Sequence, residues 1–152
     1  MNYKERYKLI PEVFLLLIDG DKILLSRRFQ TGYEDGNYGL PAGHGEDGET
    51  MRQGVVREAK EEIGIDIKID DLDFALVQHR WSSDKNNPHA RVGFYFTARQ
   101  YGGEPINNEL DKCDDLQWFF LDKLPINTIG HVRVAIECYI KGQKYSEFGW
   151  DN

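Results

Sequence analysis

The most informative segment of the sequence is GHGEDGETMRQGVVREAKEEIGI, from Gly43 to Ile65. It contains a short helix between two glycine-bearing segments. Thr50 is a favourable N-cap residue, and Gln53 three positions later completes a capping box. Gly64 has the character of a left-handed C-cap. The pattern therefore predicts a helix that begins after Thr50 and ends at Gly64.

The predicted helix has an apolar face and an acidic face beside it. At about 100° per residue, positions four apart share a face, and the apolar ones are Met51, Val55, Ala59 and Ile63. Glu58, Glu61 and Glu62 are related by i, i+3 and i+4, so their side chains are neighbours. Their negative charges repel each other, and this repulsion costs more free energy at the margin between a helix and a sheet than in open water. Gly54, one turn before Glu58, removes bulk from the acidic face.

From the residues alone, two interpretations of the acidic face are open. Runs of charge on helices are usually solvated surfaces, and Arg57 has the spacing to pair with Glu61. The alternative is a site for a divalent cation, because Mg²⁺ prefers oxygen ligands and clustered carboxylates need cations to neutralise them.

The wider spacing favours the cation site. The stretch reads G-x5-E-x7-R-E-U-x-E-E-x-G-U, where U is apolar, with fixed positions at Gly43, Glu49, Arg57, Glu58, Ala59, Glu61, Glu62, Gly64 and Ile65. Every fixed position of the Nudix box is present, so the chain resembles the Nudix hydrolases, which cleave nucleoside diphosphates linked to a further group X. The resemblance implies one Nudix domain over residues 1–152, with its box at 43–65. It also implies an α+β fold, an α/β/α sandwich with a mixed β-sheet between helices.

The resemblance further implies a role for each polar position of the box. The expected metal ligands are Glu58, Glu61 and Glu62, with Mg²⁺ as the cofactor and Mn²⁺ as its substitute. One of them, with Glu58 as first candidate, acts as the general base. Arg57 orients the carboxylates, and Glu49 supports the site from the preceding loop. A backbone carbonyl near Gly43 completes the coordination sphere.

Residues outside the box add candidates. In the MutT-like branch of the family an acidic residue of a later loop is a further metal ligand, and Glu109 stands at the matching distance. Its competitors nearby are Asp111, Asp114 and Asp115, and a plain acidic surface loop is the alternative. An arginine at the end of the second strand contacts phosphate in the same branch. Arg27 and Arg28 are the candidates, and strand alternation predicts that they lie on opposite faces.

Three further residues are candidates for contact with the substrate. His44 lies one residue into the box loop, where a lone histidine is more often solvated. Asn127 and His131 lie in the turn PINTIGH and are candidates for a base pocket.

Apolar runs predict the remaining elements. The expected strands are 12–19, 22–29, 73–81, 90–100 and 116–122, the first two forming a hairpin. A closing helix is expected over 132–142, with Val132, Ile136, Tyr139 and Ile140 on one face. The aromatic segment 145–150 is expected to pack against the domain.

Composition bounds the partners and the location. A net charge of −7 over 152 residues disfavours a nucleic-acid polymer, whose phosphates need a basic surface. Cys113 and Cys138 have no metal-ligand spacing and are interpreted as free thiols in a reducing compartment. The sequence has no signal-peptide core and no apolar run long enough for a membrane span. We therefore expect a cytoplasmic protein with no membrane partner. Relatives in the family often pair, so a homodimer is left open.

The box defines the bond that is cleaved, not the group that is recognised. ADP-ribose pyrophosphatases tend to have a proline where Arg80 stands, and dinucleoside polyphosphate hydrolases a tyrosine near Ser82 and Ser83. The NADH-cleaving array SQPWPFPxS is absent. By elimination, the chain resembles the MutT-like nucleoside triphosphate pyrophosphohydrolases. Two alternatives stay open: a sugar nucleotide or other diphosphate substrate, and a nucleotide-binding Nudix module without turnover.

Overall fold

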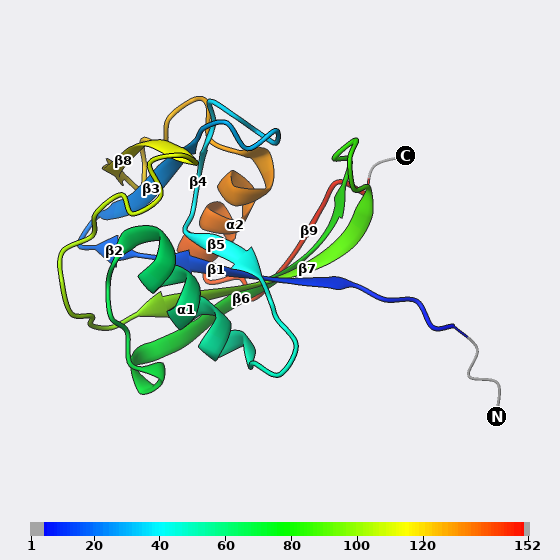
Figure 1. Ribbon diagram of the computed structural model, residues 1–152, viewed down its shortest axis with the longest axis horizontal. Coiled ribbons are helices and arrows are strands. Elements are labelled where there is room, and N and C mark those ends of the chain that lie inside the picture. The colour runs from blue at the N-terminus through cyan, green and yellow to red at the C-terminus, as the bar shows by residue number, and fades with distance from the viewer. Residues whose placement is uncertain (1–4, 151–152) are drawn as a thin grey trace.

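The computed structural model describes residues 5–150, which form two β-sheets and two α-helices (Figure 1). The strands are β1 Ile10–Leu16, β2 Ile18–Asp19, β3 Lys22–Arg28, β4 Tyr38–Gly39, β5 Ala42–His44, β6 Leu72–Ser82, β7 His89–Ala98, β8 Cys113–Phe120 and β9 Tyr145–Phe148. The helices are α1 Met51–Ile63 and α2 Gly130–Ile140, and a 3₁₀ turn spans Ile69–Asp71. None of the helices within residues 5–150 is long and apolar enough to cross a membrane.

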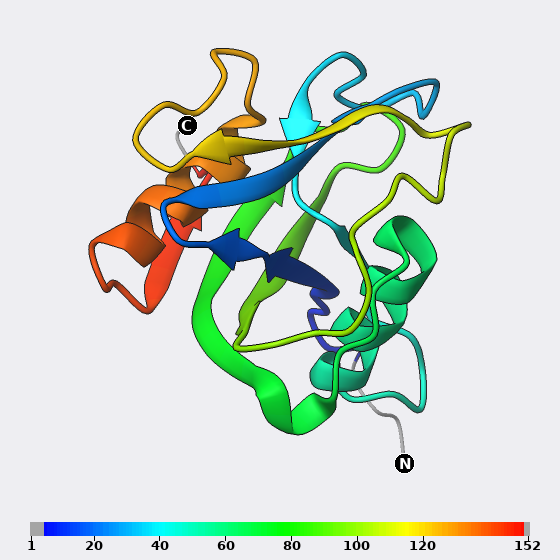
Figure 2. The same ribbon diagram turned by 90° about the vertical axis from the view of Figure 1, so that its left-hand side faces the viewer.

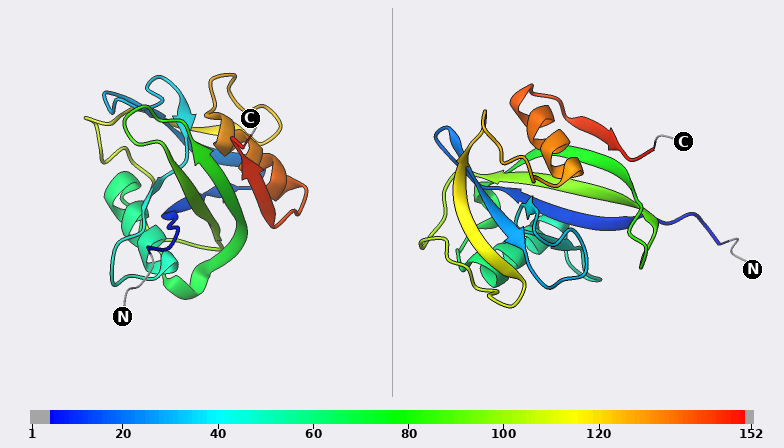
Figure 3. Two further views of the ribbon diagram at one scale, coloured as in Figure 1. Left: turned by 90° about the vertical axis from the view of Figure 1, so that its right-hand side faces the viewer. Right: turned by 90° about the horizontal axis from the view of Figure 1, so that it is seen from above.

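The larger sheet is mixed and lies between the two helices. Its strand order is β5-β1-β7-β6-β9, with β1 parallel to β7 and β6 parallel to β9. Val13 and Leu15 of β1 pack in one core with α1, whereas Phe14 and Leu16 pack in a second core with α2. Successive strand side chains point to opposite faces, so one strand supplies both cores. Figure 3 shows the helices on opposite sides of this sheet, which confirms the expected sandwich.

The smaller sheet holds β3 between β4 and β8, with β2 pairing the start of β3 (Figure 2). Of the first predicted strand, 12–19, only the last two residues, Ile18–Asp19, pair with β3 as the predicted hairpin requires. The run 12–19 divides after Leu16, and β1 joins the larger sheet instead. Both faces of β1 are buried there, which explains its continuous apolar sequence.

The helix signals of the box are confirmed. The Thr50 side chain accepts a hydrogen bond from the Gln53 backbone N–H at 3.1 Å, and the Gln53 side chain accepts one from the Thr50 N–H at 2.8 Å. Gly64 ends α1 with φ 71°. Three of the four predicted apolar residues, Val55, Ala59 and Ile63, are fully buried.

The C-terminal elements follow the prediction with one exception. Val132 and Ile136 are buried on α2, but Ile140 is 54% exposed because α2 ends there, beyond the edge of the core. The segment 145–150 packs as expected. Its strand β9 pairs with β6, and the Trp150 indole N–H donates to the His79 carbonyl at 3.0 Å.

Candidate functional site

A pocket of about 610 Å³ lies between α1, β5 and the end of β3. One of its walls is acidic and comes from α1 and from the loop before β8; its members are Glu58, Glu61, Glu62 and Glu109. Basic residues from β3, β6, β7 and the same loop also line it: Arg27, Arg28, Arg80, Arg91 and Lys112. A negatively charged group and a cation can therefore be held side by side in this pocket.

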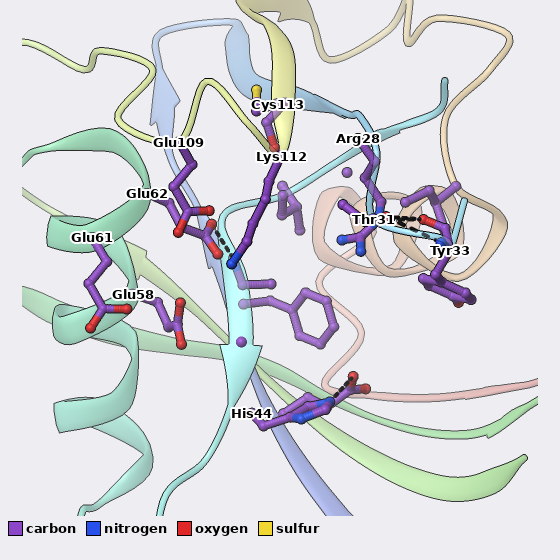
Figure 4. A pocket seen from close by; sticks show the side chains of 18 of the residues that line it. Arg28, Thr31, Tyr33, His44, Glu58, Glu61, Glu62, Glu109, Lys112 and Cys113 are labelled. Carbon is purple, nitrogen blue, oxygen red and sulfur yellow. Dashed lines mark hydrogen bonds and ion pairs between the residues drawn. The ribbon is translucent and has the colours of Figure 1, made fainter. Parts of the chain in front are cut away.

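The acidic wall brings together residues that are distant in sequence. Figure 4 shows Glu58, Glu61 and Glu62 extending from α1 and Glu109 approaching from the loop. An oxygen of Glu62 accepts a hydrogen bond from the Ala42 backbone N–H at 3.0 Å. Burial raises the pKa of Glu62 well above its usual value, and the nearby carboxylates of Glu58 and Glu109 raise it further. Burial also raises the pKa of Glu58, against the lowering effect of Arg57.

Arg57 connects the box loop to the acidic wall. Its Nε and Nη2 donate to the two carboxylate oxygens of Glu49 at 3.0 and 2.8 Å. Its Nη1 donates to Glu58 at 2.6 Å and lies 3.5 Å from a carboxylate oxygen of Glu61. The hydrogen bonds from Arg57 hold the pKa of Glu49 below its usual value. One guanidinium thus donates to carboxylates of the box loop and of α1, and its role in orienting metal ligands stays a prediction.

Gly43 is required by a close approach at this wall. A Cβ at this position would lie 2.0 Å from an oxygen of Glu58. Only a residue without a side chain therefore lets β5 approach the carboxylate this closely. A Cβ on Gly54 of α1 would meet a Glu49 oxygen at 3.0 Å, so this helical glycine also makes room for the box.

A divalent cation fits the donor chemistry of the acidic wall. The side chains of Glu58, Glu61, Glu62 and Glu109 present carboxylate oxygens, the ligands that Mg²⁺ prefers, and burial with the neighbouring carboxylates raises the pKa of Glu62. Within residues 5–150, no three acidic, histidine or cysteine side chains already surround one metal position. Glu58 is instead turned toward Arg57. Ligation by the predicted set, Glu58, Glu61, Glu62, Glu109 and the Gly43 carbonyl, stays a prediction.

The structure separates Glu109 from the acidic residues that compete with it as a metal ligand. Glu109 lines the pocket, whereas Asp111, Asp114 and Asp115 are not among its lining residues. Asp114 forms an ion pair with Arg27, and the distance between Asp114 Oδ1 and Arg27 Nε is 2.7 Å. Asp115 accepts a hydrogen bond from the Tyr38 hydroxyl.

Both arginines of β3 line the pocket, and their side chains have different partners, so the predicted alternation stays a prediction. The register shift between β3 and β8 leaves Asp114 of β8 between the partners of Arg27 and Arg28, and Asp114 forms the ion pair with Arg27. The Nε of Arg28 donates to the Tyr33 carbonyl at 2.7 Å, and its guanidinium lies over the Tyr33 ring.

Of the other three residues that were predicted to contact the substrate, two line the pocket and one does not. His44 and His131 line the pocket. Asn127 is not among the lining residues, and its side-chain amide donates to the Gly36 carbonyl at 2.8 Å. In this structure it joins two loops.

Sequence reasoning missed a buried charge cluster beside the pocket, formed by Glu12, Arg80 and Arg91. Arg80 entered the sequence argument only as the residue that replaces a proline. The available signal was the presence of charged residues inside segments predicted to be strands, since such residues are rarely buried unless they are paired.

His131 makes the stability of the fold depend on pH. Burial lowers the pKa of His131 well below 6.5, and the charges of Arg80, Arg91 and Arg28 lower it further. Below about pH 6.5 His131 becomes protonated in the unfolded chain but stays neutral in the folded protein. Stability is therefore lost as the pH falls toward the folded-state pKa of His131. We expect the free energy of unfolding to fall by up to about 1.4 kcal/mol per pH unit between about pH 6.5 and 5 from this group. Urea titrations of the wild type and His131→Phe at several pH values measure the free energy of unfolding. An equal dependence of this free energy on pH in the two proteins would contradict the assignment.

Comparison with known proteins agrees with this geometry. Residues 8–136 match the family model of the NUDIX domain. The NAD-capped RNA hydrolase NudC of Pseudomonas aeruginosa is 35% identical over 119 residues, which are 78% of this chain and 38% of that protein. NudC of Pseudomonas entomophila is 31% identical over 138 residues, 88% of this chain and 45% of that protein. The chain thus spans less than half the length of these curated relatives.

Solved structures show the same fold. The MutT NUDIX hydrolase from Burkholderia pseudomallei superposes with a TM-score of 0.76 at 29% identity, covering 86% of this chain and 97% of that one. The MutT protein from Methanosarcina mazei Go1 superposes with a TM-score of 0.74 at 19% identity, covering 91% and 97%, and supports the fold alone. Because the family model covers most of the chain and the box forms its acidic wall, the chain belongs to the Nudix hydrolase family.

Proposed function

We propose that this protein is a Mg²⁺-dependent hydrolase, with Mn²⁺ as a possible substitute ion, that cleaves a phosphoanhydride bond of a nucleoside diphosphate linked to a further group X. The observation that carries the proposal is the convergence of Glu58, Glu62 and Glu109 on one pocket wall, against Gly43. These side chains come from α1 and from a loop more than forty residues later, and the carboxylates of Glu58 and Glu109 add to the effect of burial in raising the pKa of Glu62. Such an arrangement is stable at neutral pH when cations occupy it.

The residues divide the chemical work. The bound cation would polarise a phosphoryl oxygen and neutralise the charge that develops on the leaving group. Glu58 would accept the proton of the attacking water, since burial raises its pKa toward the range that suits a general base. Arg27 and Arg28 from β3, and Lys112 from the same loop as Glu109, would bind phosphate oxygens.

Two substrate classes are favoured by different observations. The accessory signals of other branches are absent, which favours a nucleoside triphosphate. The relatives named NAD-capped RNA hydrolases favour a dinucleotide such as NAD. The net charge of −7 argues against a long polynucleotide, and we propose a small nucleotide as the substrate.

A substrate panel tests this function. The protein is incubated with nucleoside triphosphates, NAD, sugar nucleotides and a short NAD-capped RNA, with Mg²⁺, with Mn²⁺ or with EDTA. Products are separated by ion-exchange chromatography. Metal-dependent release of a nucleoside monophosphate supports the proposal, and the preferred compound defines X. Tight binding without turnover of any compound would instead favour a nucleotide-binding module.

Arg57→Lys tests the positioning role of the guanidinium. Lysine keeps the charge but cannot bridge both Glu49 oxygens and Glu58 at once. Because residues that orient metal ligands typically contribute about 10–100-fold, we expect kcat to fall by about that factor. Arg52→Lys, on an exposed position of the same helix, is the matched control. Equal kcat values for Arg57→Lys and Arg52→Lys would remove the role.

A further inference from the structure

The buried charge cluster of Glu12, Arg80 and Arg91 lies on the side of the larger sheet that faces α2. Glu12 precedes Phe14 on the same face of β1, and Phe14 packs in the core that contains α2. The three residues are only 7%, 4% and 6% exposed. All three nevertheless line the pocket, so the pocket continues past the edge strand β5 from the acidic wall to this cluster.

The cluster has more positive than negative charge. The Nε and Nη2 of Arg80 donate to Glu12 at 3.2 and 2.9 Å, and Nη1 of Arg91 donates to the same carboxylate at 3.2 Å. Two guanidinium groups thus share one carboxylate, which leaves one positive charge in excess. Asp84 also lines this part of the pocket, but its carboxylate accepts from the Asn86 N–H at 3.0 Å and forms no ion pair within residues 5–150.

Arg91 also has unused hydrogen-bonding capacity. Its Nη1 lies 3.1 Å from the His44 Nε2 and its Nη2 donates to the Asn87 carbonyl at 3.4 Å. Its Nε is buried and has no hydrogen-bond partner among the described residues. A buried donor without a partner costs stability, and a cluster with a purely structural role would pair its charges and its donors within the fold. Because Arg91 lines the pocket, its guanidinium fork is suited to an oxyanion bound there.

We propose that Arg80 and Arg91 form an anion subsite that binds a negatively charged group of the substrate outside its diphosphate, a phosphate monoester or a carboxylate. Glu12 is a positioning residue that holds the two guanidinium groups beside each other. The subsite rests on the proposed function, because it lies in the same pocket as the acidic wall. Consecutive residues of β5 connect the two regions: Gly43 faces Glu58, and His44 contacts Arg91.

Three matched dinucleotides test the subsite. NAD has no charged group outside its diphosphate, apart from the nicotinamide cation. NADP adds a phosphate monoester, and deamido-NAD replaces the amide by a carboxylate. We expect the wild type to hydrolyse one of the two anionic compounds with a kcat/KM about tenfold or more above that for NAD, as for a charge-assisted contact. In Arg91→Gln this ratio should fall to about one, and in Arg91→Lys it should be intermediate, because the charge remains but the fork is lost. Which anionic compound is preferred distinguishes phosphate from carboxylate.

Arg99→Gln is the control, since Arg99 is exposed on the surface and should keep the wild-type ratio. A wild-type ratio near one for both anionic compounds overturns the subsite, even if Arg91→Gln fails to fold. A lower kcat/KM for all three compounds by one common factor in Arg91→Gln also overturns it. If no dinucleotide is hydrolysed, the proposal that dinucleotides are substrates is rejected. Calorimetric Kd values for the three compounds then test the subsite separately. Tighter binding of an anionic compound that is lost in Arg91→Gln supports it, and equal Kd values reject it.

Discussion

Replacing Glu62 with glutamine is expected to lower kcat by at least about 10³-fold, because the proposed metal ligand beside the reacting phosphate would be lost. The same change is expected to leave the metal-free protein at least as stable as the wild type at neutral pH. Glutamine keeps an acceptor for the Ala42 N–H. It also removes a partly buried charge whose pKa is raised by burial and by two neighbouring carboxylates.

The two effects have opposite signs, so together they separate a functional residue from a structural one. Thermal melts in EDTA and in Mg²⁺ measure the stability part. Mg²⁺ should raise the melting temperature of the wild type, since a ligand that binds only the folded state stabilises it, and it should raise that of Glu62→Gln much less. Glu137→Gln, on an exposed position of α2, serves as the control. A variant that melts well below the wild type in EDTA and still responds to Mg²⁺ would contradict the assigned role.

Gly43→Ala is expected to reduce kcat by about 10²-fold or more, because displacement of catalytic groups by about 1 Å can have an effect of this size. The added Cβ would stand 2.0 Å from a Glu58 oxygen and 2.2 Å from its carboxyl carbon. The carboxylate must then move, and its contact with Arg57 at 2.6 Å must change with it. The measurement is kcat in Mg²⁺ beside a thermal melt in EDTA.

Gly102→Ala gives the matched control for this prediction. A Cβ there would have only atoms of Asp66 within 4 Å, the nearest at 3.9 Å, so its activity and melting temperature should stay close to those of the wild type. If Gly43→Ala retains wild-type kcat, then Glu58 can occupy another position without loss, and its proposed role as the base is contradicted.

The site was predictable wherever its geometry is local. Glu58, Glu61 and Glu62 share one helix, and the spacing of a helix determines which side chains are neighbours. Thr50, Gln53 and Gly64 define the ends of that helix through hydrogen bonds and backbone angles that reach no further than a few residues.

Prediction failed where neighbouring strands decide the outcome. Asp114 entered the sequence argument only as a competitor of Glu109, and the register shift between β3 and β8 brings it into an ion pair with Arg27. The hairpin expected from 12–29 is reduced to two residues of β2, because β1 finds its partners in β5 and β7. Both results depend on a strand that is distant in the sequence.

The box helix, its caps, its acidic and apolar faces and the family that they indicate can all be predicted from residue spacings along one helix. The position of Glu109 in the acidic wall, and the contacts of Glu12 with Arg80 and Arg91, which are 68 and 79 residues away, depend on how distant elements pack. Burial, and with it the raised pKa of Glu62 and an Arg91 donor that has no partner within residues 5–150, exists only once separate elements pack together. Contacts across such distances depend on sheet order and register, which no local pattern of residues contains.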